Sequence, residues 1–263
     1  TSGNNIAIGQ CAMRCHDTSG NNNLALGYSA LRENEGSNNV ALGSVASFCN
    51  TTGCYNTSLG YAAGKCTTTG CHNFSVGQCA GVSNETSSDN ISIGQHTNYC
   101  GKGAANIAIG RKSRFHDDLV GNSFNVAIGD CVMMGATNMG TSTGNIAIGR
   151  GAGFAHSAGL ANIFLGCYTG GCNAGGNQNV LLSRKAGYRN QTGNDNVMIG
   201  DCAGYGDSGS GGTNQNCNVF IGKYAGYHNR GDHNIAIGLR AGEKIQTGCC
   251  NIFLGPQAGR CAS

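Results

Sequence analysis

The sequence predicts an all-β fold, a parallel β-solenoid of about 15 rungs of ~17 residues each, running through residues 1–263 as a single repeat array. Three observations lead to this prediction. A short motif recurs at nearly constant spacing, its apolar block is four residues long and therefore too short for a helix, and Gly occurs 46 times against a single Pro. In addition, charged residues make up 11% of the chain, where about 25% is usual for a globular domain.

Each copy of the motif ends with an aliphatic residue followed by Gly, which we call the anchor glycine. Most successive anchors stand one repeat length of about 17 residues apart, and Ser183 replaces Gly in one copy. The anchor glycines are Gly9, Gly27, Gly43, Gly60, Gly77, Gly94, Gly110, Gly129, Gly149, Gly166, Gly200, Gly222, Gly238 and Gly255. The copies cover the chain, so the sequence leaves no room for a separate catalytic domain.

An Asn stands four residues before every anchor position. If the rungs stack in register, these side chains lie above one another, and their amides can pass hydrogen bonds from rung to rung. We therefore predict a structural Asn ladder rather than a ligand site. Its members are Asn5, Asn23, Asn39, Asn56, Asn73, Asn90, Asn106, Asn125, Asn145, Asn162, Asn179, Asn196, Asn218, Asn234 and Asn251.

The residues three and one before the anchor are apolar in every copy except at Thr57. They share one face of a strand, and we expect them to form the inner wall of the coil. The residue between them faces the other way. It is Ala or Ser in the first nine copies and mostly large afterwards, and a strand that is apolar on both faces is normally covered on both. We therefore predict an interface with another chain at Phe164, Leu181, Met198, Phe220 and Phe253. The alternative is that small residues there only relieve crowding.

A second motif, Ala-Gly, follows many anchors, as at Ala63-Gly64 and Ala203-Gly204. We expect a second short strand in each rung, with Ala filling a narrow interior and Gly adopting the left-handed backbone of a corner. An aromatic residue often comes next, as at Tyr188, Tyr205 and Tyr227. These rings either form a contact surface or pack, half exposed, against neighbouring rungs.

The string Asn-Ile-Ala-Ile-Gly-x-x-Ala, found at residues 5–12 and 145–152, resembles the head repeat of trimeric autotransporter adhesins, the YadA-like head. Similar repeats occur in fibre proteins of phages and large viruses. The resemblance covers essentially the whole chain. It implies a left-handed β-roll, three copies packed side by side as a homotrimer, and a role in surface display and attachment.

Sixteen cysteines indicate an oxidising location. Cys49 and Cys54 bracket one loop, and Cys66 and Cys71 bracket the next. We predict a disulfide within each loop. The rival pairing runs along the stack, from Cys49 to Cys66 and from Cys54 to Cys71, because neighbouring rungs also fall within the usual Cα separation. Zinc binding by these Cys-x4-Cys pairs is disfavoured in an oxidising context, and we expect no metal.

The two ends of the chain continue the repeat. Joining the last anchor to the first would reproduce the repeat length itself, and Cys15 and Cys261 would then share one register position as a candidate end-to-end contact. We expect either that the array continues or that subunits stack head to tail. The chain begins with Thr1, so we expect it to be processed or trimmed.

Asn-x-Ser/Thr sequons in the loops make Asn50, Asn84 and Asn190 candidate glycosylation sites. The cysteine count favours an extracellular location, at a cell surface or on a virion.

The predicted function is a structural extracellular fibre or filament segment whose main partner is itself. The alternative is an adhesin or viral receptor-binding fibre that binds host or matrix glycans or proteins through loops 115–123, 133–144 and 206–217. No catalytic motif recurs, so we predict neither an enzyme nor a cofactor. A net charge of +3 does not indicate nucleic acid, and no apolar stretch is long enough to span a membrane.

Overall fold

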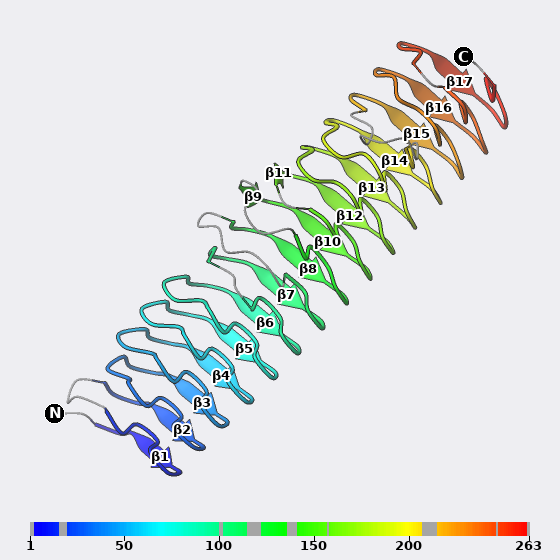
Figure 1. The fold of residues 1–263 in the computed structure, drawn as a ribbon. Coiled ribbons are helices and arrows are strands. Elements are labelled where there is room, and N and C mark those ends of the chain that lie inside the picture. Colours follow the sequence, from blue (N-terminus) through cyan, green and yellow to red (C-terminus); the bar gives the residue numbers. More distant parts are fainter. Residues whose placement is uncertain are drawn as a thin grey trace. The chain divides into compact units, whose positions relative to one another are not determined.

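The structure is a computed structural model that describes residues 3–15, 20–99, 102–114, 122–135, 141–156, 158–206, 215–245 and 247–261. It is an all-β protein whose chain coils as a parallel β-solenoid (Figure 1). The chain forms two compact units, Thr1–Ile128 and Gly129–Ser263. Each unit is built from the same repeat and is described separately.

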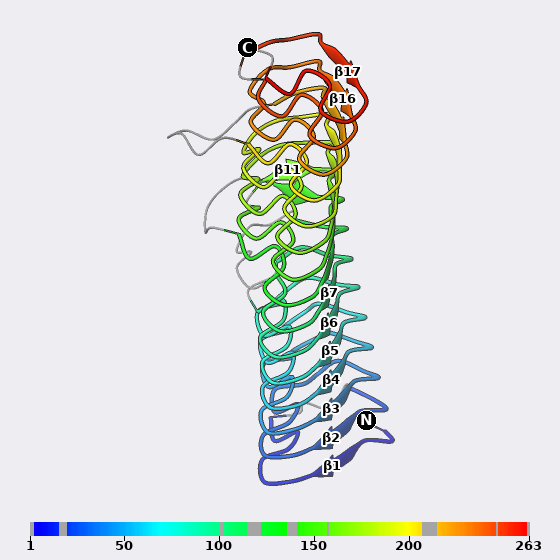
Figure 2. The ribbon, with the colours of Figure 1, turned by 90° about the vertical axis from the view of Figure 1, so that its right-hand side faces the viewer.

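The first unit contains eight short strands that pair in parallel in the order of the chain (Figures 1 and 2). Each step along the stack advances the register by one repeat, as in the pairs Leu24–Val40 and Ile107–Val126. The strands are β1 (Ile6–Ile8), β2 (Leu24–Leu26), β3 (Val40–Leu42), β4 (Thr57–Leu59), β5 (Phe74–Val76), β6 (Ile91–Ile93), β7 (Ile107–Ile109) and β8 (Val126–Ile128).

The second unit repeats this arrangement with seven strands, and its longest step joins Val197 to Val219. The strands are β10 (Ile146–Ile148), β12 (Ile163–Leu165), β13 (Val180–Leu182), β14 (Val197–Ile199), β15 (Val219–Ile221), β16 (Ile235–Ile237) and β17 (Ile252–Leu254). A separate two-stranded parallel sheet joins β9 (Ser142–Thr143) to β11 (Gly159–Leu160). Each predicted motif copy therefore forms a strand, and the two units together make about 13 turns of about 17 residues.

The return segment, which we define as the six residues after each anchor, does not form the second strand that we expected. Its second and fourth residues instead adopt left-handed backbone conformations, as at Ser29 (φ 52°) and Leu31 (φ 48°). The N–H of Ser29 donates to Gln10 of the rung before at 2.9 Å, and the N–H of Leu31 donates to Ala46 of the rung after at 3.0 Å. Alternating donation in both directions along the stack takes the place of a regular strand ladder.

The anchor glycines are required by both backbone conformation and space. Gly60 has a φ of +127°, and a Cβ built on it would lie 2.8 Å from the carbonyl oxygen of Gly77 on the next rung. A side chain there would have to displace the backbone of its neighbour. The one substitute, Ser183, has a φ of 96°.

The strands face the opposite way from our prediction. The central residue of each three-residue strand from β2 to β8 and from β10 to β16 is buried, and the two flanking residues face outward. Phe164, Leu181, Met198 and Phe220 are fully buried inside a single chain, so the interface predicted at these four residues is wrong, whereas at the half-buried Phe253 it stays a prediction. The reason is that the return segment packs against the strand centres and closes the coil over them.

In several rungs the core is filled by size complementarity between the strand centre and the fourth residue of the return segment. Rungs with a large strand centre have Gly at the facing position: a Cβ on Gly170 would lie 2.6 Å from the Phe164 ring, and one on Gly226 would lie 2.6 Å from the Phe220 ring. Where the strand centre is Ala25, the facing residue is the fully buried Leu31. Each rung therefore holds one large side chain or several small ones, as close packing requires.

Candidate functional site

The outward-facing residues form a continuous apolar face on the strands of each unit. In the first unit Ile8 is 59% exposed and Ile91 37%, and in the second unit Ile148 is 39% exposed and Leu165 37%. The other outward positions of these strands are exposed or half-buried beneath their neighbours and are apolar except at Thr57. No side chain of the described residues covers this face, which we call the outer strand face. An apolar surface of this kind marks a site of association.

The Asn ladder is present in both units. Within each unit, the Oδ1 atom of one ladder Asn accepts the backbone N–H of the ladder Asn on the next rung, for example from Asn73 to Asn56 at 2.9 Å and from Asn179 to Asn162 at 3.0 Å. The Nδ2 atom donates to the carbonyl three residues before that next Asn, as from Asn56 to Gly70 at 2.8 Å. Each such amide therefore makes two hydrogen bonds to the backbone of the following rung. The role of the ladder is structural.

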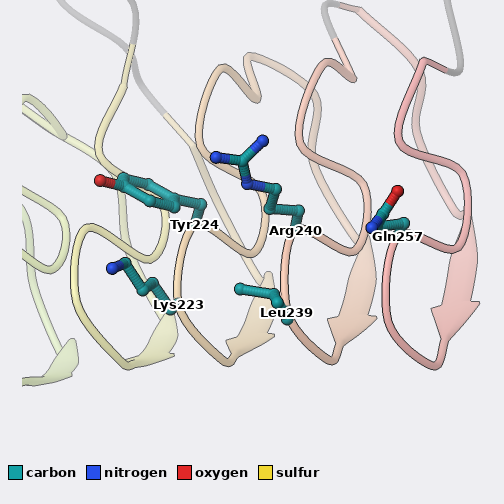
Figure 3. A pocket seen from close by; sticks show the side chains of 5 residues that line it. All are labelled: Lys223, Tyr224, Leu239, Arg240 and Gln257. Atoms are coloured by element: carbon teal, nitrogen blue, oxygen red, sulfur yellow. The ribbon is translucent and has the colours of Figure 1, made fainter.

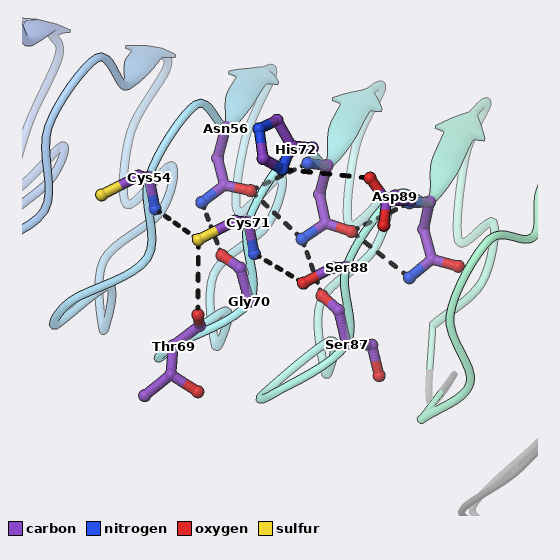
Figure 4. Close-up of polar contacts among 11 residues, drawn as sticks. Cys54, Asn56, Thr69, Gly70, Cys71, His72, Ser87, Ser88 and Asp89 are labelled. Atoms are coloured by element: carbon purple, nitrogen blue, oxygen red, sulfur yellow. Dashed lines mark hydrogen bonds and ion pairs between the residues drawn. The ribbon is translucent and has the colours of Figure 1, made fainter.

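A second ladder lies two residues before the first and was not predicted. There the side chain on one rung accepts the N–H of the residue in the same position on the rung before, as from Asn177 to Asn194 and from Asn194 to Asn216, both at 2.9 Å. In the first unit sulfur takes part: Cys54 donates its N–H to Sγ of Cys71 at 3.1 Å, and Cys71 donates to Oγ of Ser88 at 3.0 Å (Figure 4). The recurrence of Ser, Cys, Asn and Asp two residues before the ladder Asn was the sequence signal that could have predicted this second ladder.

The three predicted glycosylation sites are buried. Asn50, Asn84 and Asn190 are at most 1% exposed, and all three lie seven residues after an anchor position. The Nδ2 atom of Asn50 donates to Oδ1 of Asn34 at 2.6 Å and to the carbonyl of Gly53 at 3.0 Å. A glycan on such a nitrogen would force the coil open, so the prediction of glycans at these positions is wrong for the folded chain.

His156 occupies the same register position, seven residues after Gly149, and is 3% exposed. Its ring meets the edge of the Phe164 ring, with centroids 5.4 Å apart. Burial lowers the pKa of His156 from 6.5 to about 4, although the neighbouring Asn173 acts in the opposite direction. The imidazole is therefore neutral at physiological pH and serves as part of the core.

Every described cysteine is a free thiol. Cys49 donates its N–H to the carbonyl of Lys65, next to Cys66, and Cys54 and Cys71 are neighbours in the second ladder. These contacts join successive rungs rather than the two ends of one loop. Cys15 and Cys261 are exposed, and their end-to-end contact stays a prediction.

Aromatic residues of the return segments stack from rung to rung in the second unit. The ring centroids of Tyr188 and Tyr205 are 5.4 Å apart, and those of Tyr205 and Tyr227 are 5.0 Å apart, with nearly parallel planes. All three rings are half-buried. Of the two predicted arrangements, packing against neighbouring rungs is therefore the one observed.

An open cavity of about 430 Å³ lies beside these rungs, lined by Lys223, Tyr224, Leu239, Arg240 and Gln257 (Figure 3). The Nζ atom of Lys223 lies 5.3 Å from the centroid of the Tyr224 ring, and the guanidinium of Arg240 lies 5.5 Å from it. The cavity therefore presents two cations around one ring.

Among the described residues, no three His, Cys, Asp or Glu side chains are grouped closely enough to hold a metal ion. No helix in the same part of the chain is long and apolar enough to cross a membrane. Of the three loops predicted to bind a host ligand, residues 115–121, 136–140 and 207–214 lie outside the described residues.

Comparison with known proteins gives no relative: no protein-family model, no curated protein and no solved structure matches the chain.

Proposed function

We propose that this protein is a structural segment of an extracellular fibre, and that copies of the chain associate side by side through the outer strand face. The observation that carries the proposal is the apolar character of that face. At both outward positions of nearly every strand the side chain is Ile, Leu or Val, where a water-facing solenoid would carry Thr, Lys or Glu.

The size of the face is consistent with a multivalent contact. With about 4.8 Å per strand and about 3.3 Å per residue, eight three-residue strands present roughly 10 by 38 Å, or about 400 Å². A stable interface buries about 800 Å² per partner. The strands of one unit therefore supply about half of such an interface, and the turns that border them would add to it.

The proposed assembly is a homotrimer, which the resemblance to YadA-like heads supports. The sixteen cysteines support a location outside the cell or on a virion. The fold itself supports a structural role, because its two hydrogen-bonded ladders stabilise the stacking of the rungs.

The test is the solution mass of the wild type and of a variant with charges on the outer strand face. Ile146→Lys/Ile148→Lys places two cations on the outer strand face at β10, where Ile146 is 37% and Ile148 39% exposed. We expect the wild type to sediment at about three times 26.8 kDa, and the variant to sediment as a folded monomer.

The matched control is Leu160→Lys, because Leu160 is 45% exposed but belongs to the separate β9–β11 sheet. It should leave the assembly intact. A wild type that is monomeric at all concentrations, or a double variant that assembles like the wild type, would contradict the proposal.

A second candidate function is attachment to an anionic glycan through the cavity at Lys223, Tyr224 and Arg240. The two cations around the ring carry this candidate. Lys223→Ala/Arg240→Ala should abolish retention on an acidic polysaccharide column, whereas Lys65→Ala in the first unit should not. Equal retention of both variants would exclude the cavity as the site.

A further inference from the structure

Two pairs of cysteines lie at matching positions on the same two successive turns of the first unit. Cys49 and Cys66 each follow an anchor by six residues, and Cys54 and Cys71 each precede the next anchor by six. The strands of these turns, β4 and β5, are paired in register from Thr57–Phe74 to Leu59–Val76. Among the described residues, no other cysteines share a register position on successive turns.

Local hydrogen bonds hold both pairs in register. Cys49 donates its N–H to the carbonyl of Lys65 at 2.9 Å, which places its backbone beside that of Cys66. At the other end of the loop, the carbonyl of Cys54 accepts the N–H of His72 at 3.0 Å, and the N–H of Cys54 points at Sγ of Cys71 (Figure 4).

We propose that Cys49–Cys66 and Cys54–Cys71 are two inter-turn disulfide sites, which on oxidation staple together the two ends of the loops that precede β4 and β5. Neighbouring parallel strands are about 4.8 Å apart, which is within the Cα separation of about 4.4–6.8 Å that a disulfide spans. The spacing of the stacked turns is therefore compatible with both disulfides.

The oxidant is a small-molecule disulfide such as oxidised glutathione. One thiolate of a pair attacks it and forms a mixed disulfide, releasing the first small thiolate. The second cysteine then attacks the protein sulfur of the mixed disulfide and releases the second. For each staple one S–S bond forms and one breaks, two electrons pass to the small disulfide, and the two cysteine protons end on the two released thiols.

Burial, followed by the neighbouring Cys66, raises the pKa of Cys49 from 9.0 to about 11. Cys49 is therefore a protonated thiol at neutral pH, and the thiolate is the reactive form. Formation of the Cys49–Cys66 staple should accelerate as the pH rises from 7 to 9.

The test uses the position of Lys65, which is the only Lys or Arg between Arg32 and Lys102. Trypsin therefore separates Cys49 and Cys54, on residues 33–65, from Cys66 and Cys71, on residues 66–102. The native chain is treated with oxidised glutathione, its remaining thiols are alkylated, and the digest is mapped without reduction. Cleavage after Glu85 removes the segment that carries Cys100.

We expect the two tryptic peptides to be joined by disulfides. Cys49→Ser/Cys66→Ser and Cys54→Ser/Cys71→Ser should each retain one link, and the quadruple variant should retain none. Cys79→Ser is the matched control, because Ala62 and His96, and no cysteine, occupy the same register position on the adjacent rungs. This variant should retain both links.

Oxidation should also raise the melting temperature of the wild type by roughly 5 °C or more, and that of the quadruple variant not at all. Separate peptides with internal disulfides would overturn the proposal in favour of loop pairing. Alkylation of all four cysteines in the oxidised wild type would overturn it as well.

Discussion

At the scale of single residues, stability rests on side chains that bond the backbone of the next rung. Asn73 is 3% exposed: its Oδ1 accepts the N–H of Asn90 at 3.1 Å, and its Nδ2 donates to Ser87 at 2.8 Å and to Asn56 at 3.1 Å. Removing the amide would leave several buried groups without partners, and unsatisfied buried groups are costly.

We therefore expect Asn73→Ala to lower the free energy of unfolding by about 2–4 kcal/mol, as measured by urea denaturation. The control is Gln95→Ala, which removes an exposed side-chain bond to Gln78 and should cost less than about 0.5 kcal/mol. Equal costs for the two variants would show that the ladder does not stabilise the coil.

His156 gives the fold a dependence on pH. Its pKa is about 4 in the folded chain and 6.5 when unperturbed, so between these values the unfolded chain binds a proton that the folded chain does not. Stability should therefore fall as the pH drops from about 7 towards 4 and should level off below that, with a loss of about 3 kcal/mol.

The control is His156→Asn. Asn is the residue found at the same register position on the next rung, at Asn173. The difference in unfolding free energy between pH 7 and pH 4 should be about 3 kcal/mol smaller in this variant than in the wild type. Identical pH profiles would rule out His156 as the titrating group.

At the scale of the rung, the strand and its return segment are matched in volume. Gly170 has a φ of +56°, and a Cβ on it would lie 2.6 Å from the Phe164 ring. Gly170→Ala should therefore be costly in the wild type and much less costly when Phe164 is Ala. We expect a coupling energy of about 1–2 kcal/mol in this double-mutant cycle, measured by chemical denaturation.

Phe220 provides the comparison, because it lies in another rung of the same unit. Combining Phe220→Ala with Gly170→Ala should give costs that add within about 0.5 kcal/mol. A coupling of similar size in both cycles would contradict size matching within a rung.

The rung also shows how far the sequence predicts the structure. The repeat fixes the strand positions and the Asn ladder, because both depend only on register. It does not reveal which strand face is inside. Both faces are apolar, so the alternation of side chains along the strand does not distinguish the inner face from the outer one. The match of Phe164 with Gly170, and of Ala25 with Leu31, was the missing signal.

The same holds for the site residues. A sequon carries no information on burial, so the sequence predicted surface positions for Asn50, Asn84 and Asn190. Their shared register, seven residues after an anchor, identifies them as one interior column only once the direction of the coil is known. That Cys49 lies beside Cys66, and Cys54 beside Cys71, follows from the repeat register alone. The hydrogen bonds that these cysteines make could not be predicted from the sequence.

At the scale of the whole molecule, each unit combines a filled interior with an apolar outer strand face. The interior is complete within one chain, because the strand centres and the return segments fill it. The outer strand face has no such partner within the described residues, and we infer that other copies of the chain supply it.

The most direct test of this account is a cryo-EM reconstruction of the assembled protein. We predict that the outward residues of β10, Ile146 and Ile148, are buried between copies, while Phe164 and Phe220 stay enclosed within single chains. An assembly joined through other surfaces, with the outer strand face open to solvent, would contradict the central claim.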